Sequence, residues 1–186
     1  AEPPADLAWD ISGTGKLFAG HERLLIQGQL HSLIAVAIML TLLMLVLWRS
    51  LSLAAASMVP NLAPIVLIFA VMGVLGIWLD IATAMIASVA IGIAIDDTIH
   101  FMHAYRSRRQ HGASLPWAIA RASRQAGRAI TATTIILVGQ FLLVASSDFQ
   151  PTAAFGLMTA FGLIVALLFD LLVLPAMLVS GQRLRR

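Results

Sequence analysis

Two adjacent carboxylates, Asp96 and Asp97, lie inside the apolar stretch from Ser88 to Tyr105. An acid in a membrane-spanning helix costs roughly 2.5 to 3.5 kcal/mol on insertion scales, so an acid in such a place generally has a function. Repulsion between two neighbouring carboxylates in a low dielectric keeps at least one of them protonated much of the time. The acid pair is therefore the first candidate for a functional site in this chain.

Five small or polar residues around the pair recur at steps of four and three, which places them on one face of a helix. They are Ser88, Gly92, Asp96, His100 and His103. We expect Ser88 and Gly92 to let a neighbouring helix approach closely, because both are small. Asp96 and the two histidines can relay a proton toward the cytoplasm, since imidazole exchanges protons near neutral pH. We call these five residues the polar stripe.

Asp97 lies about 100° round the helix from Asp96, which follows from 3.6 residues per turn, so the two acids can meet different partners. One alternative is that both acids are buried polar groups that are hydrogen-bonded only for helix packing. Another is a metal site made of Asp97, His100 and His103, although three ligands on one continuous helix seldom close a coordination shell.

The composition is that of an integral membrane protein, with 60% hydrophobic and only 11% charged residues and a mean hydropathy of +0.92. Such values lie outside the usage of soluble domains. The chain has no cysteine, which excludes disulfides and cysteine-bound zinc. Long apolar segments predict five membrane helices. Their approximate ranges are 30–48, 51–79, 81–105, 129–146 and 151–180.

The segments around these spans carry their own signals. Residues 1–16 are expected to form a short strand and a turn that belong to a domain whose remainder is missing, and a helix from Leu17 feeds into the first span. Ser114 is expected to cap a short helix that lies on the cytoplasmic membrane surface before the fourth span.

In the second span, Pro60 and Pro64 should kink the helix, because proline cannot donate a backbone hydrogen bond. Asn61 can offer its side-chain amide to the backbone groups that the prolines leave free.

Positive charge predicts the orientation, since short loops rich in Lys and Arg stay cytoplasmic. Of the twelve Lys and Arg residues, six lie between the third and fourth spans and three end the chain. The loops after the second and fourth spans contain none. The N-terminal segment is therefore expected on the periplasmic or extracellular side, and the C-terminal tail in the cytoplasm.

Three further polar positions lie within the spans. Thr133 and Thr134, together with Thr131, can hydrogen-bond the acids, although threonines in membrane helices more often bond to their own backbone. Asp170 comes late in the fifth span, so we expect it near the cytoplasmic surface as a structural anchor. No role is assigned to His21, His31 and His111.

Several sequence segments together resemble one membrane half of a resistance-nodulation-division (RND) exporter, of the branch that includes the MMPL and Patched-like proteins. The segments are MVPNLAPI, GIAIDDTIHFMHAYR, TATTIILVGQFLL and FGLMTAFGLIVALLFDLLVLPAML. The leading LAWDISGTGKLFAGHERLLIQGQLHS resembles the end of that superfamily's extracytoplasmic porter domain.

The resemblance implies an all-α polytopic membrane protein with five transmembrane helices and a cytoplasmic interfacial helix. It divides the chain into residues 1–29, the end of a truncated extracytoplasmic α/β porter domain, and residues 30–186, the five-helix membrane domain. Such a domain would be one half of a longer protein in a bacterial inner membrane. It could be either half, and the short basic tail favours the C-terminal one.

The function implied is export of hydrophobic or lipid-like molecules driven by the proton-motive force. Asp96 matches the GxxxD carboxylate of the superfamily, beginning at Gly92, and Asp97 stands where the MMPL branch commonly has Tyr. Which of the two acids titrates therefore stays open. Protons are the coupling ion and no cofactor is implied. The implied partners are the other membrane half, the porter domains, membrane lipids and the substrate; a homo-oligomer is possible, and no nucleic acid is implied.

Two other classes of function compete with transport. A five-helix module of this kind also corresponds to a sterol-sensing domain, which would bind a lipid without transporting it. An intramembrane aspartyl protease would need acids that face each other from two helices. Adjacent Asp96 and Asp97 do not supply this, and Asp170 is expected at a different depth. We therefore expect the chain not to be an enzyme.

Overall fold

The structure is a computed structural model, and it describes residues 14–183. Within this range all regular structure is helical, and five helices are long and apolar enough to cross a membrane, as the sequence predicts. The strand expected near the N-terminus falls on residues 1–13, outside the described range. The elements are α1 (Thr14–Trp48), α2 (Leu51–Leu75), α3 (Ile81–Gln110), α4 (Leu115–Ala145), α5 (Gln150–Leu168), the π-helical η1 (Phe169–Val173) and α6 (Leu174–Arg183).

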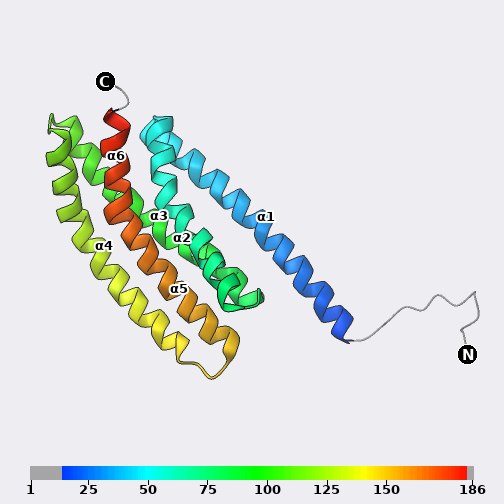
Figure 1. The fold of residues 1–186 in the computed structure, drawn as a ribbon. Coiled ribbons are helices and arrows are strands. Elements are labelled where there is room, and N and C mark those ends of the chain that lie inside the picture. The colour runs from blue at the N-terminus through cyan, green and yellow to red at the C-terminus, as the bar shows by residue number, and fades with distance from the viewer. Residues whose placement is uncertain (1–13, 184–186) are drawn as a thin grey trace, which may run out of the picture.

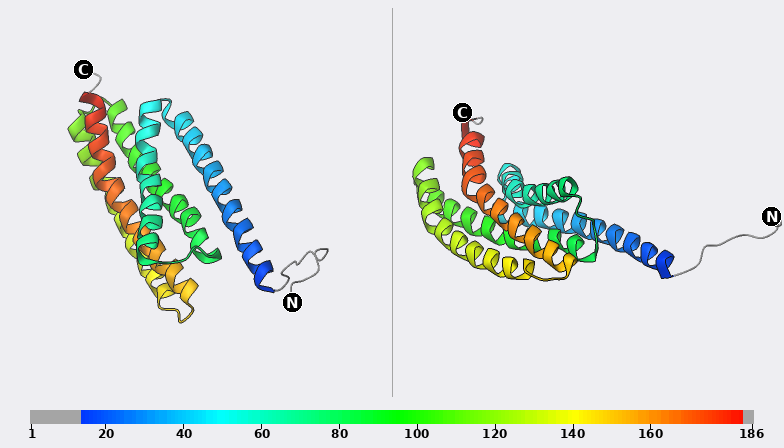
Figure 2. Two further views of the ribbon diagram at one scale, coloured as in Figure 1. Left: turned by 45° about the vertical axis from the view of Figure 1, so that its right-hand side comes forward. Right: turned by 60° about the horizontal axis from the view of Figure 1, so that its bottom comes forward.

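The helices form a bundle in which α3 is central, because it packs against α1, α2, α4 and α5 (Figures 1 and 2). α5, η1 and α6 follow one another without a break, and α6 bends away from the direction of α5, which packs beside α4 (Figure 2). The α1–α2 and α3–α4 turns lie with the end of α6 at one end of the bundle, which we call the basic end because of its arginines. The α2–α3 and α4–α5 turns and the start of α1 lie at the other end.

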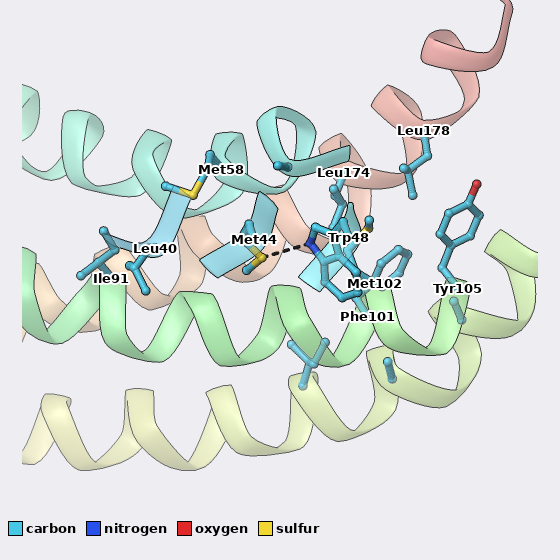
Figure 3. Packing of buried hydrophobic residues seen from close by; sticks show 14 of the residues in the cluster. Leu40, Met44, Trp48, Met58, Ile91, Phe101, Met102, Tyr105, Leu174 and Leu178 are labelled. Carbon is cyan, nitrogen blue, oxygen red and sulfur yellow. Dashed lines mark hydrogen bonds between the residues drawn. The ribbon is translucent and has the colours of Figure 1, made fainter. Parts of the chain in front are cut away.

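Trp48 anchors the end of α1 to the bundle core near the basic end (Figure 3). Its indole nitrogen donates to the sulfur of Met44 at 3.0 Å. The guanidinium of Arg106 in α3 lies 5.5 Å from the centre of the Trp48 ring and donates to the carbonyl oxygen of Leu47 at 3.0 Å. A cation over an indole face and a hydrogen bond to a free carbonyl at a helix end both stabilise this junction.

The boundary between α2 and α3 differs from the prediction, which ran the second span to residue 79. α2 ends at Leu75 because Gly76 has a left-handed conformation with φ 67°, which glycine adopts without strain. Asp80 then caps α3: its carboxylate accepts from the Thr83 backbone N–H at 2.7 Å, and the Thr83 hydroxyl accepts from the Asp80 N–H at 2.8 Å. This capping box fixes where α3 begins.

The separate interfacial helix predicted before the fourth span is not observed, since α4 runs unbroken from Leu115 to Ala145. Ser114 does occupy the N-cap position, but its side chain makes no capping hydrogen bond. Ala118, Ala122 and Ala126 are buried in the same apolar cluster as the end of α3. Small side chains on this face let α4 continue along α3 instead of turning onto the membrane surface.

α2 also continues through both of its prolines, Pro60 and Pro64, which are buried in the bundle. The amide of Asn61 donates to the carbonyl oxygen of Ser57 at 2.6 Å. This carbonyl lies four residues earlier, whereas the proline at position 60 leaves the carbonyl of Ala56 without its helical donor. The expectation that Asn61 serves a proline-freed carbonyl is therefore wrong, and its amide oxygen remains available to another helix.

Substitution of Gly156 tests the contact between α4 and α5. A Cβ added there would lie 2.5 Å from the backbone nitrogen of Ala145 and 2.6 Å from the carbonyl oxygen of Phe141. Because backbone atoms cannot move aside, Gly156→Ala should lower the free energy of unfolding by about 1–3 kcal/mol. Thermal denaturation of the detergent-solubilised protein measures this.

Gly139→Ala is the matched control, since nothing lies within 4 Å of a Cβ added at Gly139 in α4. It should be neutral or stabilising by about 0.5–1 kcal/mol, because alanine favours a helix over glycine. Equal melting temperatures for the two variants would contradict the α4–α5 packing.

Candidate site at the acid pair of α3

The polar stripe lies on one face of α3, as its spacing predicts. Ser88, Gly92, Asp96, His100 and His103 are all exposed in this chain. Nε2 of His100 lies 3.7 Å from Oδ1 of Asp96, with the two side chains 69% and 73% exposed. Asp96 and His100 therefore present an acid and an imidazole side by side on an exposed part of α3.

Asp97 turns away from the stripe into the bundle and is only 8% exposed. The angular separation of two successive helical residues thus gives the two acids different surroundings, as expected. Asp96 meets the exterior of the bundle, whereas Asp97 lies against its interior.

Both acids line one cleft between α3 and α4, with a volume of about 890 Å³. The cleft extends from the acid pair toward the basic end. His100 and His103 line it, and so do polar residues that the sequence did not single out. These are Ser107, Arg108, His111, Trp117 and Gln125.

A second hollow of about 560 Å³ touches the same acids from the other direction. Gly92, Thr133 and Leu137 are among the residues that line it. The acid pair is thus accessible from two sides of the α3–α4 contact.

The mouth of the cleft is held by hydrogen bonds from arginines at the end of α3. Arg108 donates to the side-chain oxygen of Gln125 in α4 at 2.5 Å and to the carbonyl oxygen of Ala104 at 3.2 Å. Arg109 donates to the carbonyl oxygen of Ala113 at 2.8 Å. The Arg108–Gln125 bond ties α3 to α4 beyond the acids, and the Arg109–Ala113 bond fixes the turn between the two helices. His111, to which the sequence gave no role, lines the cleft.

The threonines of α4 lie near the acids, but no hydrogen bond between them is observed in the described range. Thr133 lines both hollows, and its hydroxyl donates to the carbonyl oxygens of Ala129 at 3.2 Å and Ile130 at 2.9 Å. Thr134 is buried. For Thr133 the structure therefore shows the back-bonding that is usual for threonine in a membrane helix.

The expectation that Gly92 admits a neighbouring helix is not met by the helices described. Nothing lies within 4 Å of a Cβ added at Gly92. Ser88 does meet a neighbour, since its hydroxyl accepts from the side-chain amide of Gln29 in α1 at 2.6 Å. The close contact thus forms one turn before Gly92, and the face beyond it stays open.

Asp170 is the largest departure from the sequence-based expectation. It is fully buried inside the bundle, in η1. Its Oδ1 accepts from the hydroxyl of Thr98 at 2.7 Å, and the same hydroxyl lies 3.5 Å from Oδ1 of Asn61 in α2. Thr98 follows Asp97 in the chain, so Asp170 lies at the depth of the acid pair.

The difference between the predicted and the observed position of Asp170 has a physical cause. Pro175 cannot donate to the carbonyl of Leu171, and the helix widens just before it, with the Leu174 N–H bonding to the carbonyl of Phe169. This wider turn directs Asp170 toward α3. One sequence feature could have indicated that Asp170 is buried: the apolar run around it resembles the run around Asp96 and Asp97.

Neither rival chemistry gains from this geometry. Within residues 14–183, no three His, Asp or Glu side chains gather as a metal site would need. Although the depth argument against a protease was wrong, Asp170 does not line the cleft that holds Asp96 and Asp97. Asp170 and the acid pair therefore do not line a common cleft for a substrate and a water.

Comparison with known proteins agrees with the resemblance. The model of the MMPL family matches residues 1–185. The chain belongs to the MMPL family, and thereby to the RND superfamily. The MMPL match covers the acid pair, the cleft and Asp170 alike.

The chain is also 35% identical over 126 residues to a protein of Methanocaldococcus jannaschii whose name says only that it is a membrane protein. This stretch is 68% of the chain and 32% of the relative. This MMPL chain thus aligns with about a third of that relative's length.

Cysteine labelling tests the geometry of the cleft, because the chain contains no cysteine of its own. His103→Cys should react rapidly with a membrane-impermeant maleimide, since residue 103 is exposed in the cleft. Met102→Cys is the control, because Met102 is fully buried one position earlier. Mass spectrometry of the labelled protein gives the two rates. Equal rates would contradict the cleft.

Proposed function

We propose that this chain is one membrane half of an exporter of hydrophobic or lipid-like molecules, driven by the proton-motive force through Asp96 and Asp97. The observation that carries the proposal is the cleft that both acids line. It gives protons a path to carboxylates in the middle of a membrane helix. Membership of the MMPL family supports a transporter of the RND type.

The different exposure of the two acids suits proton coupling. Asp96 is open toward the stripe and His100, whereas Asp97 is nearly buried. A carboxyl that gains or loses a proton in such surroundings changes the energy of its own burial by several kcal/mol. Movement of one charge across 100 mV supplies about 2.3 kcal/mol, which is of the order that such a step requires.

The exposed stripe supports a second membrane half as partner. An acid on a lipid-facing surface costs roughly 2.5 to 3.5 kcal/mol, and the described helices leave the Asp96 side chain 73% exposed. Repeated halves that meet at the substrate or ion site are common in transporters. The other half would lie over Ser88, Gly92 and Asp96, where Gly92 leaves room for it.

The arginines give the proposed orientation. Loops rich in arginine stay in the cytoplasm, so the basic end and the mouth of the cleft would face the cytoplasm of a bacterial cell. The start of α1 would then lie on the periplasmic side, where porter domains would select the substrate. Protons serve as the coupling ion, without a further cofactor.

Transport by the full-length protein in proteoliposomes with an imposed pH gradient tests the coupling role. Asp96→Asn and Asp97→Asn each keep the side-chain volume and remove the titratable group, so export driven by the gradient should fall to background. Asp148→Asn is the control, since Asp148 is an exposed acid in the α4–α5 turn and should leave export unchanged.

Full gradient-driven export by the Asp96→Asn, Asp97→Asn double variant would refute the proposal. Lipid binding that persists in a protein without any export would favour the sensing module instead.

A further inference from the structure

A buried polar cluster joins three segments of the bundle behind the acid pair. It consists of Asn61 in α2, Thr98 in α3 and Asp170 in η1, each with no exposed surface. Thr98 donates to Oδ1 of Asp170 at 2.7 Å and lies 3.5 Å from Oδ1 of Asn61. Polar groups without access to water are costly unless they are paired, so a cluster at this depth calls for a function.

The Asp170 carboxyl is only half satisfied. Its Oδ1 accepts from Thr98, whereas its Oδ2 is buried and has no hydrogen-bond partner among the residues that the structure describes. A charged oxygen left in this state costs far more than the carbonyl oxygen of a neutral carboxyl group. The geometry therefore suits an acid that binds a proton in one state of the protein and releases it in another.

The orientation of Asn61 makes it an acceptor toward Thr98. Its amide nitrogen donates to the carbonyl oxygen of Ser57 at 2.6 Å, which leaves Oδ1 directed at α3. Thr98 has one hydroxyl hydrogen and two acceptors within reach, Asp170 and Asn61. Which of them receives the hydrogen depends on whether Asp170 carries a proton.

We propose that Asp170 is a third proton-binding acid of this membrane half, and that its protonation reverses the Asn61–Thr98–Asp170 hydrogen-bond chain. With Asp170 charged, Thr98 donates to it, as the structure shows. When Asp170 takes up one proton, its own O–H donates to the Thr98 hydroxyl oxygen, and Thr98 donates to Asn61. Loss of the proton restores the first state. This inference rests on the proposed function for its link to transport.

The reversal changes how the helices are tied together. In the charged state the strong bond joins α3 to η1, whereas in the neutral state α3 is also bonded to α2 through Asn61. Because Thr98 follows Asp97, any shift of α3 at Thr98 also moves the acid pair. Asp170 thus acts on the cleft as a positioning residue through Thr98.

Few charged or titratable residues surround Asp170, so a change in its protonation with pH is simple to interpret. On α3 the acids Asp97 and Asp96 lie one and two residues before Thr98. α2 has no titratable residue, and Gln150–Ser180 has none except Asp170 itself. On α4, Arg128 lines a hollow to which Leu171, the residue after Asp170, also contributes.

Infrared spectroscopy of the full-length protein in lipid, recorded across a pH series, tests proton binding without any need for transport. A C=O band of a protonated carboxyl group should vanish as the pH rises, and Asp170→Asn should remove this band. Thr98→Val should shift its frequency, because the hydrogen bond to the carboxyl is lost. If Asp170→Asn removes no titrating band, the proposal is wrong.

Transport provides the second readout. Because Thr98 is bonded to Asp170 in both proposed states, Thr98→Val should shift the pH of half-maximal export by about one to two units. Thr159→Val is the matched control, since Thr159 is equally buried but donates only to the carbonyl oxygen of Phe155. It should change neither the band nor the pH profile.

The outcomes separate this inference from the proposed function. Export that survives loss of both Asp96 and Asp97 refutes proton coupling at the pair, whereas the infrared band still decides whether Asp170 binds a proton. If Asp170→Asn fails to fold, Thr98→Val carries the test. An unchanged band and pH profile in that variant would overturn the hydrogen-bond chain.

Discussion

The cost of placing carboxylates in hydrocarbon governs the arrangement of this bundle. Its membrane-spanning helices carry three acids in their interior parts, Asp96, Asp97 and Asp170, and each has a different solution to that cost. Asp97 is turned inward beside the cleft, and Asp170 is buried with a hydroxyl donor. Asp96 remains on the open face next to His100. Central α3 brings all three to one level, because it packs against every helix that supplies a neighbour.

The packing around this level is divided between apolar and polar contacts. Near the basic end, aromatic and methionine side chains such as Trp48, Phe101 and Met102 fix α1, α3 and α6 together (Figure 3). At the middle, the α2–α3–η1 contact is made through Asn61, Thr98 and Asp170. Apolar packing holds one geometry, whereas a hydrogen-bond chain can exist in two. The bundle thus has an apolar end that holds one geometry and a polar middle whose hydrogen bonds can be rearranged.

The sequence could predict much of the site because its signals are local. The steps of four and three that relate Asp96, His100 and Ser88 fix their common face, and the 100° turn to Asp97 fixes its separate direction. Other features depended on partners distant in the chain. Gly92 looked like a packing residue, yet no described helix reaches it, while Gly156 makes the tight contact instead. The sequence shows that both residues are small, but it does not show which helix packs against each of them.

The sequence by itself determined the membrane class, the five spans, the acid pair and the family, because hydropathy, helical period and motif are properties of nearby residues. Only the tertiary structure decided that α4 is one helix, that α3 and α4 enclose a cleft, and that Asp170 meets Thr98 across 72 residues of chain. The π-helical turn before Pro175 rotates Asp170 into the bundle, and the contact exists only because α3 lies there to receive it. The depth and direction of a side chain in a membrane helix depend on the helices against which it packs, and the whole bundle determines which helices those are.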